Sequence, residues 1–239
     1  MKNKKFKQKR KVWFRALKGI LKIFIKKPTF VYKGGKPTAG SIILSNHEGA
    51  SSPLALELYS DFPIRMWGTY EMNSGLKSVY KYLSNVYFHE KQHKNLHLAR
   101  FISIFACPFV NLFYKGLNLI PTYRDVRLYK TMTESIKIIK DGRDNIVIFP
   151  ENSDKGYFKH LKSFYAGFVV LAHRLFKAGI DVSIYVAYYK TETREYVFDA
   201  PIYFSELNSA FTSKNEIAGY LLEKCNSIGG NGLQEKTPA

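Results

Sequence analysis

The chain has 239 residues, with 37 Lys and Arg against 19 Asp and Glu, and therefore a formal net charge of +18. Because 46% of its residues are hydrophobic and 15% are aromatic, the chain can build a packed core, which excludes disorder throughout. Only two cysteines occur, Cys107 and Cys225, so a disulfide framework and a cysteine zinc site are excluded and a reducing compartment is indicated.

The positive charge is concentrated at the N-terminus. Residues 1–27 hold twelve Lys and Arg and no acid, so the other 212 residues hold only 25 basic against 19 acidic side chains. Apolar residues recur there at every third or fourth position, the stripe of an amphipathic helix with lysines opposite. They are Trp13, Phe14, Leu17, Ile20, Leu21, Phe24 and Ile25.

Three cations, Arg15, Lys18 and Lys22, interrupt this apolar run. The interruption argues against a transmembrane segment and against a secretory signal. We therefore expect residues 1–30 to form a basic amphipathic arm that lies on an anionic membrane surface. A nucleic-acid-binding arm is the alternative, and it is disfavoured because the rest of the chain is only mildly basic.

Strand-like and helix-like segments alternate after the arm. Strands are expected at 41–45, 64–70, 117–123, 146–149, 182–189 and 196–204. Helices are expected at 53–60, 76–114 with breaks, 126–141, 163–178 and 214–226. This alternation predicts a single α/β domain over residues 31–226, with a mostly parallel central sheet flanked by helices. The glycine-containing tail, 227–239, is expected to be disordered.

The segment Phe101–Tyr114 is apolar on nearly every face and contains Pro108. As a run it is too short to cross a bilayer. Two interpretations are open: a buried core helix, and a helix that dips into a lipid surface.

One polar segment, Ser45–Pro53 (SNHEGASSP), falls where a predicted strand ends and a predicted helix begins. Ser52 followed by Pro53 predicts the helix start, with Ser52 as the N-cap and Pro53 in the first helical position. His47 then lies on a loop at the carboxyl end of a strand, where α/β sheets place their ligand crevices.

A second polar segment follows the buried strand 146–149 and reads Phe149-Pro150-Glu151-Asn152-Ser153. Together the two segments resemble the glycerolipid acyltransferase family, which includes the lysophosphatidic acid acyltransferases. The family's first motif, Asn-His-x-Ser-x-x-Asp-Pro, is matched at Asn46, His47 and Pro53. Its third motif, Phe-Pro-Glu-Gly-Thr-Arg, is matched at Phe149, Pro150, Glu151 and, as a hydroxyl, Ser153, with Phe164 and Gly167 matching the Phe-x-x-Gly that follows.

Two weaker blocks extend the resemblance to roughly residues 41–190. The segment 116–124 resembles the family's second block, which closes on a substrate-binding arginine, here Arg124. The segment 182–189 resembles the fourth block. The four blocks occur in the family's order, and that order carries the resemblance.

The resemblance implies that His47 takes the proton of an acceptor hydroxyl, which attacks the thioester of acyl-CoA or an acyl-carrier protein. A neutral imidazole is a competent base at pH 7. No Gly-x-Ser-x-Gly segment suggests a covalent intermediate, and no metal or cofactor is expected. The substrate-binding residues implied are Asn46, Arg124, Glu151, Asn152, Ser153 and Lys155.

The family's aspartate, five residues after the histidine, is replaced here by Ser52, which cannot supply the charge that orients and stabilises an imidazolium. Three accounts are open. A carboxylate such as Glu48, Glu57 or Asp61 replaces the aspartate; Ser52 orients His47 through a neutral hydrogen bond and the enzyme is slow; or acyl transfer is lost and lipid binding remains.

The third motif also departs from the family, because Asn152 and Asp154 stand where the family has glycine and arginine. The arginine-to-aspartate reversal repels an anionic head group, and Lys155 compensates in part. The acceptor is therefore open between a glycerol phosphate, a neutral sugar, a glycolipid and another lysolipid hydroxyl.

A competing motif, His89-Glu90-Lys91-Gln92-His93, fits the His-Glu-x-x-His pattern of zinc proteases, with His97 further along. Its polar neighbours favour a solvent-facing helix over a buried zinc helix. The sequence therefore predicts a peripheral O-acyltransferase of phospholipid or glycolipid biosynthesis at the cytoplasmic face of the membrane. The alternative is a catalytically inactive lipid-binding relative.

Overall fold

A computed structural model describes residues 10–153, 156 and 158–230 of the chain. The predicted binding residue Lys155, its neighbour Asp154 and the tail from residue 231 lie outside the described residues.

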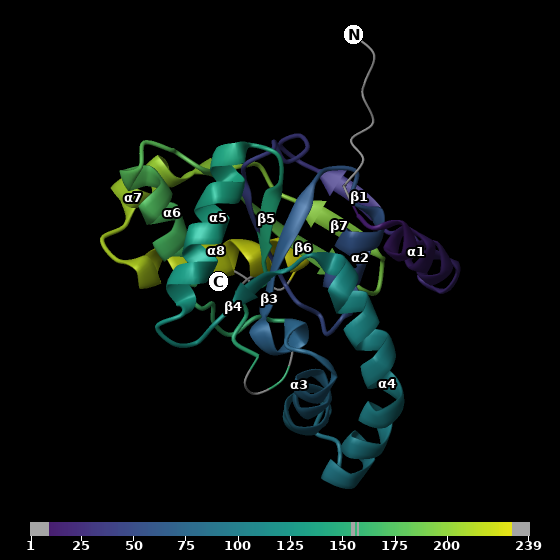
Figure 1. The fold of residues 1–239 in the computed structure, drawn as a ribbon. Helices are drawn as coiled ribbons and strands as arrows, with labels where there is room; N and C mark the ends of the chain where they lie inside the picture. Colours follow the sequence, from purple (N-terminus) through teal and green to yellow (C-terminus); the bar gives the residue numbers. More distant parts are fainter. Residues whose placement is uncertain (1–9, 154–155, 157, 231–239) are drawn as a thin grey trace, which may run out of the picture.

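The described chain forms an α/β domain around one eight-stranded sheet with the order β1-β7-β6-β2-β5-β3-β4, in which β8 also pairs with β6 (Figure 1). Five strands are parallel: β2 (Ile42–Ser45), β3 (Ile64–Thr69), β4 (Ile120–Thr122), β5 (Asn145–Ile148) and β6 (Ser183–Lys190). The other three, β1 (Thr29–Tyr32), β7 (Glu195–Phe198) and β8 (Ile202–Tyr203), run against them. The mostly parallel sheet expected from the sequence is confirmed.

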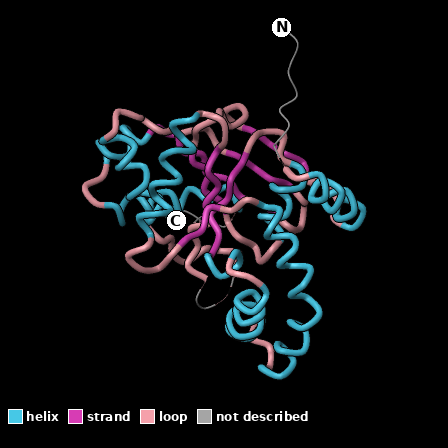
Figure 2. Tube along the Cα trace, in the orientation of Figure 1, coloured by secondary structure: helices cyan, strands magenta, loops and turns pink. Residues whose placement is uncertain are grey.

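Helices cover both faces of this sheet (Figure 2). On one face, α5 (Leu128–Asp141), α6 (Gly167–Lys177) and α8 (Lys214–Gly229) pack on Ile42, Leu44 and their neighbours. On the other, α2 (Ser51–Tyr59) packs on Ile43 and Val147. Because successive strand residues point to opposite faces, β2 and β5, buried at every position, read as continuous apolar runs in the sequence.

The N-terminal helix, α1 (Val12–Phe24), docks on the domain. Phe14 is fully buried, and its ring centroid lies 5.4 Å from that of Phe113. The buried carboxylate of Glu57 pairs with Arg10 at 2.9 Å and with Lys18 at 3.0 Å. The predicted amphipathic helix therefore buries part of its apolar stripe against the domain, while Ile20, Ile23 and Phe24 stay exposed.

A helical projection leaves the sheet between β3 and β4. The short 3-10 helix η1 (Tyr70–Asn73) leads into α3 (Leu76–Lys81), the π-helix η2 (Tyr82–Lys91) and the long helix α4 (Leu96–Leu117). Figure 1 shows α4 reaching away from the sheet with α3 beside it. At 22 residues α4 is longer than the apolar run suggested, and it continues through Pro108.

Most elements differ from their expected bounds by a few residues, and three of the differences change an interpretation. The helix α2 begins at Ser51 with Ala50 as N-cap, so Ser52, expected to be the N-cap, is inside the first turn. Pro53 is tolerated in that turn because first-turn N–H groups have no intrahelical partner. The strand expected at 196–204 is divided into β7 and β8 by the segment Asp199–Pro201, and the short helix α7 (Phe204–Ala210) follows. The helix α8 continues through Ser227, where a disordered tail was expected to begin.

Candidate functional site

The two segments predicted to form the site meet at one edge of the sheet. His47 lies on the loop between β2 and α2, and Glu151 lies on the loop after β5, three residues beyond the end of that strand at Ile148. Because β2 and β5 are parallel neighbours, their carboxyl ends lie side by side. The backbone N–H of His47 donates to Glu151 Oε2 at 3.3 Å, and the N–H of Phe158 donates to Glu151 Oε1 at 3.4 Å.

The imidazole of His47 is held by its own loop. Nδ1 is hydrogen-bonded to the carbonyl oxygen of Gly49, and the ring meets Phe149 edge-on with centroids 5.1 Å apart. Glu48 and Gly49 both have positive φ, 44° and 63°, which folds this carbonyl back toward the ring. A carbonyl only accepts, so Nδ1 carries the proton in the neutral ring and Nε2 carries the basic lone pair.

Burial shifts both ionisable groups toward their neutral forms. Burial, with a smaller contribution from the nearby cation Lys91, lowers the pKa of His47 to about 4. Burial raises the pKa of Glu151 to about 7, to which the charge of Glu48 contributes. At neutral pH the histidine is therefore an unprotonated base beside a carboxyl group that is close to half-protonated.

Ser52, which stands where the family has aspartate, belongs to a buried cluster of hydroxyls. Its Oγ lies 2.9 Å from the hydroxyl of Tyr196, which also lies 2.7 Å from Ser45 Oγ. Burial raises the pKa of Tyr196, so the cluster is neutral at physiological pH. The described hydrogen bonds of Ser52 therefore join it to Ser45 of β2 and Tyr196 of β7.

The carboxylates considered as substitutes for the aspartate make their described contacts with other residues. Glu48 accepts a hydrogen bond from Thr191 Oγ1 at 3.0 Å. Glu57 binds the two cations of the N-terminal arm, and Asp61 binds Lys36 and the hydroxyl of Tyr32. The partner seen at Nδ1 of His47 is instead the neutral carbonyl of Gly49.

Asn46, predicted to bind substrate, is fully buried and fastens the loop to β6. Its Nδ2 donates to the carbonyl of Tyr189 at 3.1 Å, and its Oδ1 accepts from the Tyr189 N–H at 2.7 Å. This pair of bonds closes the end of β2 on its neighbour, so Asn46 positions His47.

The structure adds Lys91 to the site, a residue that sequence reasoning missed. Its Nζ donates to Ser153 Oγ at 2.6 Å, which brings the end of η2 against the loop that carries Glu151. Its charge acts on the pKa of His47 and of Glu151. Lys91 is part of the His-Glu-x-x-His pattern, in which only the two histidines and the glutamate were considered as functional residues.

Arg124 and Asn152 lie at the same edge. The exposed guanidinium of Arg124 is 5.9 Å from the ring centroid of Tyr165. The backbone N–H of Tyr165 donates to the Pro150 carbonyl at 2.8 Å, so Arg124 lies beside the loop after β5. The backbone N–H of Asn152 donates to Ser163 at 3.0 Å and holds the same loop.

The His-Glu-x-x-His segment does not form a zinc helix. The helix η2 ends at Lys91, and His93 has a φ of 53°, so the two histidines are not one turn apart on one helix. Nδ1 of His89 is hydrogen-bonded to the Lys94 carbonyl at 2.8 Å. Within the part of the chain that the structure describes, no three His, Cys, Asp or Glu residues are grouped as metal ligands.

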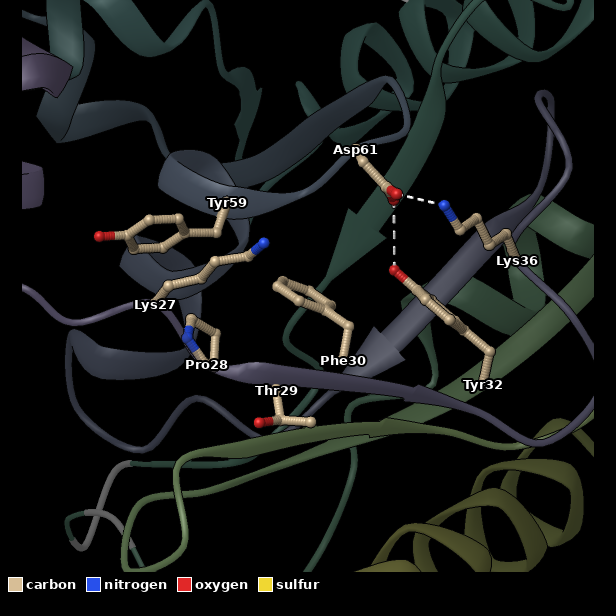
Figure 3. Close-up of a pocket in the computed structure, with 8 residues that line it drawn as sticks. All are labelled: Lys27, Pro28, Thr29, Phe30, Tyr32, Lys36, Tyr59 and Asp61. Atoms are coloured by element: carbon tan, nitrogen blue, oxygen red, sulfur yellow. Dashed lines mark hydrogen bonds and ion pairs between the residues drawn. The ribbon is translucent and has the colours of Figure 1, made fainter. Parts of the chain in front are cut away.

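A hollow of about 480 Å³ lies along the edge strand β1, apart from these residues (Figure 3). It is lined by Lys27, Pro28, Thr29, Phe30, Tyr32, Lys36, Tyr59 and Asp61. Phe30 also stacks on the ring of Tyr196 with centroids 5.8 Å apart.

In comparisons with known proteins, no family model and no curated protein sequence matches the chain. Its fold is similar to that in the crystal structure of the 1-acyl-sn-glycerophosphate (LPA) acyltransferase PlsC from Thermotoga maritima, with a TM-score of 0.52. The match has 13% sequence identity and covers 95% of this chain and 80% of that one. The likeness shows a common α/β fold.

Proposed function

We propose that the protein is a membrane-associated O-acyltransferase of lipid biosynthesis. It moves a fatty acyl group from acyl-CoA or an acyl-carrier protein to a hydroxyl of a lysophospholipid or a related acceptor. The observation that carries the proposal is the fixed His47 imidazole, with Nδ1 bonded to Gly49, at the strand edge beside Glu151. The similarity of fold to PlsC supports the same reaction class.

In the proposed reaction, Nε2 of His47 accepts the acceptor's hydroxyl proton while the oxygen bonds to the thioester carbonyl carbon. The tetrahedral adduct then expels the thiolate, which takes the proton from the imidazolium. The histidine is thereby restored within one turnover. The low pKa of His47 keeps the base neutral at pH 7, and it also makes the imidazolium costly, which favours rapid return of the proton.

Two cations beside the loop after β5 favour an anionic acceptor. Lys91 reaches the loop after β5 by way of Ser153, and Arg124 lies beside the same loop. Lys91 thus offers a positive charge beside Ser153, in a motif that has no arginine. Glu151, with its raised pKa, is suited to hydrogen-bonding the acceptor hydroxyl in either protonation state.

The second candidate function is lipid binding without turnover. It is favoured by the neutral cluster of Ser52, Ser45 and Tyr196 in the place of the family's carboxylate. Without that charge, the imidazolium formed during acyl transfer loses a stabilising partner.

For location, we propose a peripheral association with the cytoplasmic face of the membrane. The exposed Ile20, Ile23 and Phe24 of α1 and the cations of the arm support binding to anionic lipid.

The test measures acyl-CoA consumption by the full chain with lysophospholipid, glycolipid and neutral glycerolipid acceptors. His47→Ala is expected to lose activity by at least about a hundredfold, since general bases contribute rate factors of that order. His173→Ala, an exposed histidine on α6, is the matched control and keeps wild-type activity. Equal activity in His47→Ala and wild type rejects the mechanism; lysolipid binding without turnover by wild type selects the second candidate.

A further inference from the structure

The outer face of α4 is a continuous apolar surface. Six large apolar side chains on this helix are between 44% and 74% exposed. They are Leu98, Phe101, Ile104, Phe105, Phe109 and Leu112, and we call them the α4 apolar face. Exposed apolar patches of this extent mark interaction surfaces in soluble proteins.

The other side of α4 has the opposite character. Ala99, Ser103, Cys107 and Asn111 are buried there, and Cys107 joins the cluster that contains Val79 of α3 and Leu83 of η2. Small and polar residues thus face the protein, while the large aromatic and aliphatic ones face outward. The arrangement is the reverse of a core helix, which buries its largest apolar side chains.

We propose that the α4 apolar face is a lipid-docking surface that lies in the headgroup region of an anionic membrane. The charges on α4 fit such a partner, because Arg100 and Lys115 are exposed and the helix contains no Asp or Glu. The adjoining α1, whose Phe14 meets Phe113 of α4, also has cations, exposed apolar residues and no acid. Apolar side chains flanked only by cations favour anionic lipid.

Among the described residues, α4 is long and apolar enough to cross a bilayer, judged by length and composition alone. Its packing argues for an interfacial position. Cys107 Sγ donates to the Leu76 carbonyl at 3.3 Å, so α3 begins beside the middle of α4. A crossing would carry the exposed Lys77 of α3 into the hydrocarbon, at a cost of about 3 kcal/mol.

The docked position places the candidate site close to lipid. The helix η2 packs along α4, and its last residue, Lys91, is bonded to Ser153 beside Glu151. Only α4 and η2 thus lie between a membrane on the outer face of α4 and the loop that carries Glu151. The inference stands on the exposure and charge of α4, and it holds whether or not the site transfers acyl groups.

The test is co-sedimentation of the full chain with vesicles of equal parts phosphatidylglycerol and phosphatidylcholine. We expect Phe105→Ser/Phe109→Ser to bind these vesicles at least about tenfold more weakly than wild type. The matched control is Tyr129→Ser/Tyr220→Ser, which removes two exposed aromatic residues from α5 and α8 and is expected to bind as wild type does. Pure phosphatidylcholine vesicles are expected to bind all three proteins weakly.

A second measurement guards against misfolding of the double variant. An environment-sensitive fluorophore on Phe109→Cys is expected to shift to the blue with anionic vesicles, whereas the same label on Tyr129→Cys is not. Both native cysteines are buried, so the label goes to the new thiol. Wild-type binding by the double variant with no shift at position 109 would overturn the proposal and leave docking to α1. Lipid-independent self-association that requires Phe105 and Phe109 would also overturn it, in favour of an interface between two copies.

Discussion

The hydroxyl of Tyr196, from the antiparallel strand β7, lies 2.9 Å from Oγ of Ser52 in the first turn of α2. A tyrosine is therefore the hydrogen-bond partner of the serine that stands, by resemblance, where the family has its aspartate. The hydroxyl can turn its proton toward either serine, because Ser45 Oγ is also within 2.7 Å. This cluster satisfies the hydroxyl of Ser52 without a charged partner.

Ser52→Asp introduces a carboxylate into this cluster. We expect the pKa of His47 to rise above 4, because a nearby negative charge favours the imidazolium, and acyl transfer to rise at least about tenfold. Burying the charge is expected to cost roughly 1–3 kcal/mol of stability even with Tyr196 as donor. Histidine titration by NMR and acyl-CoA turnover measure the two effects. Ser52→Asn, similar in shape but neutral, serves as control, and an equal gain in both variants would contradict the electrostatic explanation.

Lys91→Gln tests the cation that the fold brings to the site. It is expected to raise KM for a phosphate-bearing lysolipid by about fivefold to tenfold, since one charge-assisted contact is lost, and to leave a neutral acceptor unaffected. Steady-state kinetics with the two acceptors check this difference. Lys81→Gln, an exposed lysine at the end of α3, is the control. An equal rise in KM for both acceptors would point to a structural role in holding Ser153.

Glu151→Gln is expected to change how stability depends on pH. The raised pKa of Glu151, about 7, means that the folded protein binds more protons than the unfolded chain from pH 4.5 to 7, so its contribution to stability falls as pH rises. His47, with a pKa lowered from 6.5 to about 4, contributes in the opposite sense between pH 4 and 6.5. In wild type the two contributions offset each other over most of this range.

Removing the carboxyl group leaves the histidine's contribution alone. The free energy of unfolding of the Glu151→Gln variant should rise as the pH rises from 4 to 6.5. Above pH 7 it should exceed that of wild type by an amount on the order of 1–3 kcal/mol. Urea denaturation at intervals of pH provides the measurement. His47→Gln should show the reverse slope, and parallel profiles in the two variants would refute the assigned shifts.

Gly116→Ala tests the docking of α1. A Cβ at Gly116 would overlap the ring of Phe14, so we expect α1 to be displaced and the protein to lose roughly 1–3 kcal/mol of stability. Limited trypsin digestion should then cut within α1 faster than in wild type. In contrast, Gly219→Ala on α8, where a Cβ meets nothing within 4 Å, should stabilise by about 0.5–1 kcal/mol. Unchanged digestion of α1 in Gly116→Ala would contradict the packing.

The sequence was sufficient for the strands and loops that carry His47 and Glu151. Both loops follow short apolar strands, and parallel neighbours must place their carboxyl ends together. Tyr196, Lys91 and the clamp of Asn46 on Tyr189 were not predictable in this way, because each joins segments far apart in the chain. Local pattern reports periodicity and turns, whereas these contacts depend on the order of strands in the sheet.

Local interpretation also failed where a stronger tertiary contact competed. The short strand β1 gave no clear signal after the basic arm, since its four residues gain their order by pairing with β7. From the sequence, Glu57 was one of the carboxylates that were considered as a replacement for the family's aspartate. Its buried carboxylate is instead neutralised by Arg10 and Lys18, a pairing that no spacing in the sequence announces.

The contacts that dock α1 come from segments separated widely in the chain: Glu57 lies on α2, and Phe113 and Gly116 lie near the end of α4. During synthesis the helix therefore leaves the ribosome long before its receptor surface exists. In that interval its full apolar stripe, Phe14 included, and all of its cations face solvent. The nascent chain thus meets its surroundings with a more apolar and more basic helix than the finished protein exposes, and Phe14 can be covered only after the chain has been made as far as Gly116.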